Sequence, residues 1–424
     1  MNDSFILKGD ICFSQKKNAA ASFENHYIVC MDGLCQGVFP SIPSKYRFLP
    51  VIDYSGRLII PGLVDLHIHA PQFSFRGMGM DLELLDWLNE ITFPEESRYS
   101  SLDYAKTAYR AFTDALQKSA TTRACIFSTI HVPATEVLME LLEATGLKTY
   151  VGKVNMDRNS PAFLMEESAL ASAEATLQWL ENCLGKYKYT MPIITPRFIP
   201  SCSDELLERL GKLQSKYKLP VQSHLSEAIG EIEWVSTLCP DSSFYGKVYD
   251  KYGLFGGNAK TIMAHCVHST PDEIQLMKER EVFIAHCPES NINLKSGLAP
   301  IRKYMEAGLH VGLGTDVAAG TSESIFSAMS EAIKTSKLQY MLLDSSLKPL
   351  TVDEVFYLAT KGGGEFFGRV GSFEAGYEFD ALVINDSSLC CLERLSPRER
   401  LERIVYLSQS CKLEHKYVSG TQLF

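Results

Sequence analysis

The stretch "PGLVDLHIHA" at residues 61–70 decides the fold. An apolar run ends abruptly in two imidazoles, His67 and His69, which are two residues apart. Side chains at positions i and i+2 of a β-strand point to the same side. The two rings are therefore expected on one face at the end of an otherwise buried strand, where polar side chains are unusual.

Seven further apolar segments follow, and each is succeeded by helical or loop sequence. They are "RACIFS" (123–128), "TYVGKVNM" (149–156), "PIITPRF" (192–198), "PVQSHLS" (220–226), "TIMAHCVH" (261–268), "VFIAHCP" (282–288) and "HVGLGTD" (310–316). Together with residues 63–69 they make eight strand–helix units, which favours a (β/α)8 barrel over an open doubly wound sheet. An open sheet would usually carry a glycine-rich phosphate loop, and no such loop stands in the sequence.

Helix signals separate these strands. Thr270 and Thr351 each precede an acidic capping-box residue, Glu273 and Glu354, and Gly308 is typical of a helix stop. An apolar stripe with spacings of three and four predicts another helix, through Leu102, Ala105, Tyr109, Phe112 and Leu116.

Both ends of the chain differ from this alternating pattern. The first sixty residues predict short strands with turns at Lys8-Gly9-Asp10 and Asp32-Gly33, and strand-like sequence returns after about Gly368. We expect two domains, a β-domain from residues 1–60 plus 369–424 and a catalytic barrel from residues 61–368.

Composition excludes several classes of protein. The chain has 424 residues, 46% hydrophobic and 22% charged, and a formal net charge of −10 without a cluster of Lys and Arg, which argues against nucleic-acid and anionic-membrane partners. Neither a signal peptide nor a membrane span is expected. Twelve cysteines without a regular spacing, several inside apolar runs, favour buried reduced thiols and a cytoplasmic protein.

Polar residues gather at the ends of the predicted strands, where barrels carry their chemistry. They are His67, His69, His224, His265, His286 and Asp316. A hydrocarbon core would not collect imidazoles and a carboxylate unless something offset their desolvation, and a metal ion does. Three imidazoles and one carboxylate suit zinc or iron, with a position left for water.

"PGLVDLHIH", "SHLSE", "AHC", "HCPES" and "GLGTD" together resemble the amidohydrolase superfamily over nearly the whole chain. The resemblance implies that the two terminal segments combine into a small β-sandwich beside the barrel. Binuclear members carry a carboxylated lysine after strand 4, whereas "PIITPRFIP" has no lysine. The resemblance therefore implies one metal ion per chain, held by His67, His69, His224 and Asp316, as in the deaminases of the superfamily.

Other stretches are similar to one subgroup, the guanine deaminases. These are "HAPQFSFRGM", "LLDWLNEITFPEE", "TPRFIPSCSDELL" and "GLGTDVAAG". The resemblance implies hydrolysis of guanine to xanthine and ammonia, by attack of an activated water on C2. Relatives in this subgroup are commonly homodimers, so a homodimer is expected.

The resemblance also implies catalytic roles. Glu227, three residues after His224, is expected to carry protons between water, a purine ring nitrogen and the leaving amine. Asp316 can bind the metal and accept a proton, and His265 is expected to hydrogen-bond the attacking water. A surface glutamate opening a helix is the alternative for Glu227. His286 is expected either to support the site residues or to have a structural role, and His268 is expected in a loop. No role is assigned to His26, His131, His310 or His415.

Guanine would be bound by polar and aromatic groups from different segments. Arg197 supplies donors for O6, and the Gln72 amide supplies a donor and an acceptor. Trp87 and Phe198 would wall the planar base, with His224 and Glu227 close to it. A core position is the alternative for Trp87.

Two other functions remain open from the sequence. The first is deamination of another aminated ring on the same scaffold, such as an adenosyl compound, cytosine or a triazine. The second is a non-enzymatic scaffold that has lost its metal, although all four expected ligands are present here.

Overall fold

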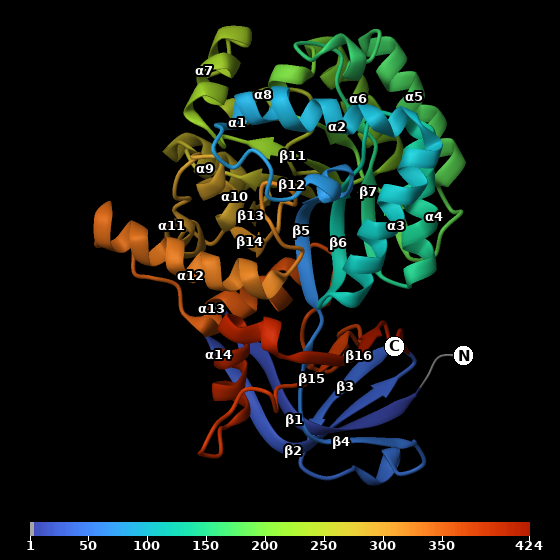
Figure 1. Cartoon of the computed structure of the whole chain (residues 1–424), viewed down its shortest axis with the longest axis vertical. Coiled ribbons are helices and arrows are strands. Elements are labelled where there is room, and N and C mark those ends of the chain that lie inside the picture. Colours follow the sequence, from blue (N-terminus) through green and yellow to red (C-terminus); the bar gives the residue numbers. More distant parts are fainter. Residues whose placement is uncertain (1–3) are drawn as a thin grey trace.

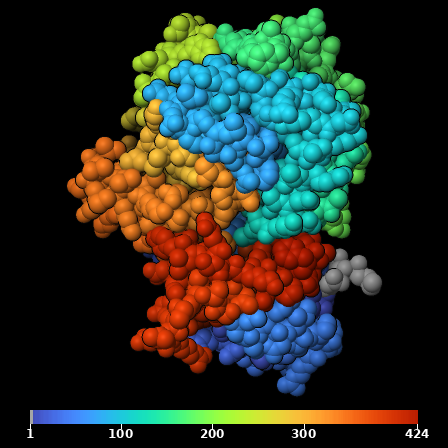
Figure 2. Space-filling view, viewed as in Figure 1, coloured from blue at the N-terminus to red at the C-terminus, as the bar shows by residue number. Residues whose placement is uncertain are grey.

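The computed structural model describes residues 4–424, which form two parts (Figure 1). One part is a single antiparallel-rich sheet built from both ends of the chain, and the other is a set of parallel strands surrounded by helices. In the space-filling view the first and last segments of the chain lie together at one end of the molecule (Figure 2). Within residues 4–424, no helix is long and apolar enough to cross a membrane.

The terminal sheet has seven strands in the order β17-β16-β15-β4-β1-β2-β3. Their bounds are β1 Phe5–Lys16, β2 Ala19–Met31, β3 Leu34–Phe39, β4 Val51–Pro61, β15 Ala381–Asn385, β16 Lys412–Val418 and β17 Thr421–Gln422. Strand β15 pairs antiparallel with β4 and so joins the two ends of the chain. A buried cluster of aromatic and aliphatic side chains covers this sheet, including Phe5, Phe13 and Phe379.

Two details of the terminal segments differ from the sequence prediction. No turn forms at Lys8-Gly9-Asp10, because β1 runs on through these residues with a bulge between Gly9 and Ile11. A Cβ on Gly9 would lie 2.9 Å from the Ile59 side chain, so the glycine permits close approach inside a strand. The C-terminal segment also contains a helix, α14 (Pro397–Leu407), that the strand-like pattern did not predict.

The strand prediction agrees closely with the parallel strands. They are β5 Leu63–His69, β6 Thr121–Phe127, β7 Lys148–Gly152, β8 Val154–Asn155, β9 Thr190–Pro192, β10 Thr195–Pro196, β11 Val221–Leu225, β12 Thr261–His265, β13 Phe283–His286 and β14 His310–Leu313. Those assigned to four-stranded sheets run β5-β6-β7-β9 and β11-β12-β13-β14. The predicted fourth strand is broken into β9 and β10, and Pro192 and Pro196 remove two ladder donors there.

Hydrogen bonds join the two parallel sheets at both edges. Ile194 N donates to Pro220 O, and Gln222 N donates to Ile194 O, beside β11. At the other edge Asp316 N donates to His67 O at 2.8 Å, so the segment after β14 pairs with β5. The carboxyl ends of β5 and of β14 therefore lie next to each other.

Helices surround these strands (Figure 1). Their bounds are α1 Leu84–Trp87, α2 Phe93–Ser97, α3 Leu102–Lys118, α4 Val132–Thr145, α5 Ala169–Cys183, α6 Asp204–Tyr217, α7 Ile229–Leu238, α8 Tyr245–Lys251, α9 Pro271–Glu279, α10 Pro288–Asn293, α11 Ile301–Glu306, α12 Ile325–Leu342 and α13 Val352–Tyr357. The predicted caps are present, since the side chains of Thr270 and Thr351 accept from Glu273 N and Glu354 N. The predicted stripe lies on α3.

The two parts meet at a seam that we define by two cations, Arg123 and Lys416. Arg123, near the start of β6, is 2% exposed and donates to the carboxylates of Asp380 and Glu378 at 2.7–3.1 Å. Lys416 of β16 donates to three backbone oxygens at the end of α3 and the start of β6. Each cation is thus buried with partners in place.

Candidate metal centre and substrate pocket

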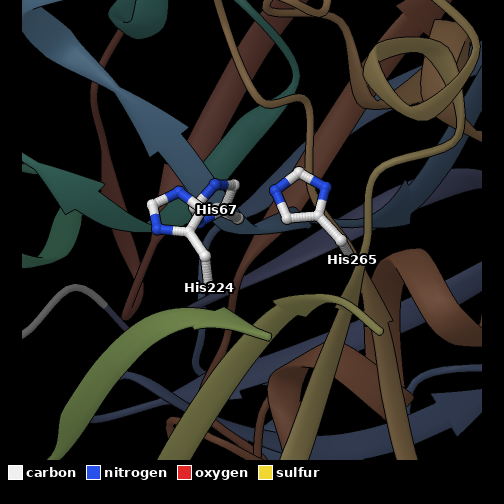
Figure 3. Close-up of side chains that lie close together, drawn as sticks. All are labelled: His67, His224 and His265. Carbon is white, nitrogen blue, oxygen red and sulfur yellow. The ribbon is translucent and has the colours of Figure 1, made fainter. Parts of the chain in front are cut away.

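The strand-end histidines converge at the carboxyl ends of β5, β11 and β12. His67, His224 and His265 each offer a ring nitrogen, and these nitrogens lie within 4.8 Å of one another (Figure 3). His69 belongs beside them, because its Nε2 is 3.2 Å from His224 Nε2. Asp316, three residues beyond β14, completes the group with Oδ1 3.1 Å from His67 Nε2 and 3.5 Å from His69 Nε2.

Partners at Nδ1 orient two of these rings. His224 Nδ1 lies 2.5 Å from Arg197 O, a carbonyl that can only accept, so Nδ1 carries the proton and Nε2 presents a lone pair. His265 Nδ1 lies 2.9 Å from Asn291 Oδ1, so Nδ1 carries a proton and Nε2 faces the common centre. Fixing the ring through its remote nitrogen is how proteins commonly orient a metal-binding imidazole.

The backbone is strained at this place. His265 has φ 72° and Asp316 has φ 49°, in the left-handed region that side chains with a Cβ rarely adopt. Such conformations persist where the surrounding structure imposes them, and they cluster at functional sites. Here they turn the chain at two strand ends so that both side chains reach the common centre.

Burial governs the charges of the cluster. Burial lowers the pKa of His67, and it lowers the pKa of His69 and of His224 far below the ordinary value. These three imidazoles are therefore neutral, the form that binds a metal. Burial would raise the pKa of Asp316, but the neighbouring His67, His265 and His69 together outweigh burial and hold that pKa low, so the carboxylate is ionised.

Glu227 lies between β11 and α7 and faces the same centre. Its Oε2 is 3.4 Å from His265 Nε2, and its Oε1 accepts from Ser296 Oγ at 3.1 Å. Burial raises the pKa of Glu227 to about 7. Burial opposes protonation of His265, yet Glu227, Asp316 and the hydrogen bond to Asn291 together outweigh burial and raise the pKa of that imidazole. A carboxyl poised near neutrality can both accept and donate a proton.

One pocket contains the metal-type cluster and the residues expected to bind the base. Gln72, Trp87, Arg197 and Phe198 line it together with His69, His224, Glu227, His265 and Asp316. Gln72 comes from the 3-10 helix Ala70–Phe75 that follows β5, and Trp87 ends α1. The Trp87 indole N–H donates to Met78 O at 3.0 Å, so the ring is fixed at the pocket wall.

The structure places the remaining histidines elsewhere. His286 ends β13, buried, and Nδ1 has no hydrogen-bond partner among the described residues. His268 Nε2 is 2.7 Å from Ser296 O, so this loop side chain braces the loop that carries Ser296. His26 and His415 lie in the terminal sheet, His310 starts β14 at the far end of the strand, and His131 precedes α4.

Cys287 is a further group near the cluster that the sequence analysis did not assign. Its Sγ lies within 4.8 Å of ligand atoms of His67 and Asp316. Burial raises the pKa of the Cys287 thiol well above its ordinary value, and the S–H faces Ala285 O at 3.5 Å. Since the thiolate is the metal-binding form, Cys287 is a poor ligand here.

Sequence reasoning missed the residues that hold the site in place. Asn291 orients His265, and Ser296 Oγ donates to Glu227. Asp65 accepts from His67 N at 3.1 Å, and it accepts from the Oγ1 and N of Thr315 at 2.6 and 3.1 Å. Glu96 bonds both Arg197 and Gln72. Asp65 stands inside the opening motif, where a charge within an apolar strand was an available signal. The others had none, because their partners are distant in sequence.

The donor set fits a single divalent metal ion. Neither ring nitrogen of His67 makes a hydrogen bond, although Asp316 Oδ1 is 3.1 Å from Nε2. Neighbouring ligand atoms bound to one ion at about 2.0–2.1 Å lie roughly 2.9–3.6 Å apart, and the separations of 3.1, 3.2 and 3.5 Å fall in that range. A buried polar atom without a partner is costly, and an ion at this centre would give His67 Nε2 its partner.

Comparison with known proteins identifies the family of this chain. Residues 58–423 match the model of the amidohydrolase family. Guanine deaminase of Dictyostelium discoideum is 38% identical over 88% of this chain and 84% of its own length, and guanine deaminase of Homo sapiens is 38% identical over 86% and 82%. The crystal structure of guanine deaminase from C. acetobutylicum with bound guanine is similar with a TM-score of 0.96 and 47% identity over the whole of both chains. This chain belongs to the amidohydrolase family.

Proposed function

We propose that this chain hydrolyses guanine to xanthine and ammonia. One observation carries the proposal, namely that a single pocket joins a metal-type cluster, a buried carboxyl and groups suited to a purine. Similarity over most of the chain to proteins named guanine deaminase supports the same reaction.

His67, His69, His224 and Asp316 would hold one divalent ion, zinc in the first place and iron as the other metal that this donor set accepts. His265 lies close enough to be a further ligand, with Nε2 3.8 Å from Asp316 Oδ2, but its approach to Glu227 at 3.4 Å favours a role toward water. When bound, such an ion supplies hydroxide near neutral pH.

Glu227, Asp316 and His265 would manage protons around C2 of guanine. The ionised Asp316 accepts a proton from the attacking water. Glu227 gives its proton to a ring nitrogen as the oxygen adds to C2, then takes the hydroxyl proton of the adduct and passes it to the amine, which leaves as ammonia. The proton held by Asp316 then restores Glu227. His265 stabilises the charge that develops on the oxygen. Burial of all three excludes bulk water from these transfers.

The base would be held through its edge and its faces. Arg197 donates to O6, and the Gln72 amide offers a donor and an acceptor to ring nitrogens. Trp87 and Phe198 pack on the planar ring, while His224 and Glu227 border C2. These six side chains all line the pocket.

The architecture belongs to the same proposal. We infer a closed (β/α)8 barrel over residues 61–368 from the hydrogen bonds that link the parallel sheets at both edges. Residues 1–60 with 369–424 form the companion β-domain, a β-sandwich in our interpretation; residues 1–3 of that range lie outside the described structure. Buried reduced thiols such as Cys125, Cys266 and Cys287 support a cytoplasmic enzyme of purine catabolism.

A homodimer is the remaining element of the proposal. The C-terminal end of α12 carries an exposed apolar group, Met341, Leu342 and Leu343, at 63–72% exposure. Clustered exposed apolar side chains commonly mark an interface. Light scattering should report twice the chain mass, and Leu342→Asp should shift it toward the monomer; a monomeric wild type would refute the dimer.

Purified protein with guanine tests the activity directly. We expect xanthine and ammonia in equal amounts, loss of both after chelation, and recovery when zinc is added back. Ammonia from adenine or cytosine but none from guanine would overturn the substrate assignment. If the protein holds its metal and releases no ammonia from any of these bases, the proposal that it is a deaminase is wrong.

A further inference from the structure

Glu96 of α2 is a buried carboxylate that the proposed reaction does not use. It is 1% exposed. Its Oε2 accepts from Arg197 Nη1 at 2.5 Å, and its Oε1 accepts from Arg197 Nη2 and from Gln72 Nε2, both at 3.0 Å. One carboxylate thus holds the two polar side chains that line the base pocket.

The same short helix also contacts the face of the guanidinium. The Phe93 ring centroid is 5.0 Å from Arg197 Cζ, a cation–π arrangement. Phe93 and Glu96 are three residues apart, so they lie on the same side of α2. Arg197 is therefore held by an aromatic face and by a two-point ion pair, which together restrict its guanidinium group to one orientation.

Gln72 is fixed at both ends of its amide. Nε2 donates to Glu96, and Oε1 accepts from Ala318 N at 3.1 Å in the loop that follows Asp316. The bond to a backbone N–H identifies the amide oxygen, because only the oxygen can accept. Glu96 therefore links α2, the residue after β10, the segment after β5 and the loop after β14 in one network.

We propose that Glu96 is a positioning residue that makes the pocket selective for purines with an oxygen at C6. This inference rests on the proposed function. A guanidinium has only donors, so it favours a carbonyl at C6 and disfavours an amino group there. That preference depends on where the donors point, and the carboxylate sets their direction. Glu96 also balances the charge of Arg197, which would otherwise be a buried cation without a partner.

Equilibrium binding of two bases to the metal-loaded protein tests the inference. Hypoxanthine has the 6-oxo group, whereas purine lacks it and the N1 proton that accompanies it. In Glu96→Gln the amide NH2 faces donors, so the two-point contact is lost. We expect Kd for hypoxanthine, measured by calorimetry, to rise about 100-fold while Kd for purine changes little. KM for guanine should rise with it, and kcat should change less.

Glu95→Gln is the matched control. It removes the same charge from the adjacent residue of α2, whose carboxylate instead contacts Ser74, Arg98 and Tyr104. We expect both Kd values to stay at those of the wild type. Glu96→Asp, which keeps the charge but is too short to reach both partners, should give a smaller change in the same direction and covers the case in which Glu96→Gln fails to fold.

Two results would overturn the inference. One is an equal loss of affinity for hypoxanthine and purine in the Glu96 variants, which a merely structural role predicts. The other is unchanged affinity for both bases. Each is distinguishable from failure of the proposed function, because in that case the wild-type protein itself releases no xanthine from guanine.

Discussion

Buried titratable side chains at the two ends of the parallel strands differ in whether their nitrogens have hydrogen-bond partners. At the carboxyl ends, both ring nitrogens of His67 and Nδ1 of His69 are buried without a hydrogen-bond partner. At the amino end of β6, Arg123 makes four hydrogen bonds to Asp380, Glu378 and Ser419. Lys416 makes three to backbone oxygens there.

The difference separates function from stability. A buried polar group whose partners are all protein atoms holds segments together, and its removal leaves those partners stranded. Several imidazoles buried together, with ring nitrogens that lack partners, cost stability, so such a cluster indicates a ligand that the fold is built to receive. Substitutions at the carboxyl ends should therefore change activity, and substitutions at the seam should change stability.

Asp316→Asn should give the largest effect. The amide lacks the negative charge that attracts a divalent cation, and it cannot accept a proton from water. We expect kcat/KM for guanine to fall by at least about 10⁴-fold, the upper range for a proton-transfer group, and bound metal to fall as well. Mass spectrometry of bound metal together with xanthine release measures both. Full activity in this variant would show that Asp316 has no role in catalysis.

Glu227→Gln should separate proton transfer from metal binding. We expect kcat/KM to fall about 10²–10⁴-fold while metal content stays at one ion per chain. Because a neutral amide avoids the cost of burying a carboxylate, thermal unfolding should show an equal or higher Tm. A lower Tm with unchanged activity would make Glu227 a structural residue.

Arg123→Met should show the opposite pattern at the seam. Breaking a buried ion pair from one side costs about 3–5 kcal/mol, so the midpoint of urea unfolding should drop. The kcat/KM of the protein that remains folded should equal that of the wild type. Arg209→Met is the matched control, since its pair with Glu205 is exposed and worth at most about 1 kcal/mol.

Lys416→Met should have the smallest effect, about 1–3 kcal/mol, because three backbone oxygens lose a donor. Burial lowers the pKa of Lys416 to about 7, below the 10.5 of an unfolded lysine. Between these values the unfolded chain binds more protons, so the free energy of unfolding should rise with pH, by at most about 1.4 kcal/mol per unit. Below pH 7 this dependence ends, since both states are protonated.

Comparison of the two proteins isolates that contribution. The difference in unfolding free energy between wild type and Lys416→Met should vary between pH 7 and 10. A difference that is constant over this range would mean that the carbonyl acceptors keep the ammonium charged.

The fold was predictable where the pattern is local. The run from Leu63 to His69 is a strand with the predicted bounds, and Thr270 and Thr351 cap α9 and α13 as expected. The full capping box forms only at α13, because the Glu273 carboxylate bonds Ser226 and Gly246 N instead. Membership of the amidohydrolase family, predicted from five short motifs, is confirmed. The supposed turn at Lys8–Asp10 was wrong because Gly9 serves a contact with Ile59, a residue fifty positions away that the local pattern does not contain.

The candidate site was predictable only in part, for the same reason. Strand ends of a parallel sheet meet, so the sequence could bring His67, His224 and Asp316 together. It could not tell Glu95 from Glu96, which are adjacent and chemically identical. Their separation arises from α2, which turns Glu96 toward Arg197 and leaves Glu95 beside Arg98. Roles set by tertiary contacts of loops and short helices were out of reach.

Diffraction from crystals of the active protein, with data on both sides of the zinc and iron absorption edges, tests the central claim most directly. We expect one anomalous peak per chain, within bonding distance of His67, His69, His224 and Asp316. Two peaks, a peak outside these four side chains, or no peak in a protein that still converts guanine would contradict it.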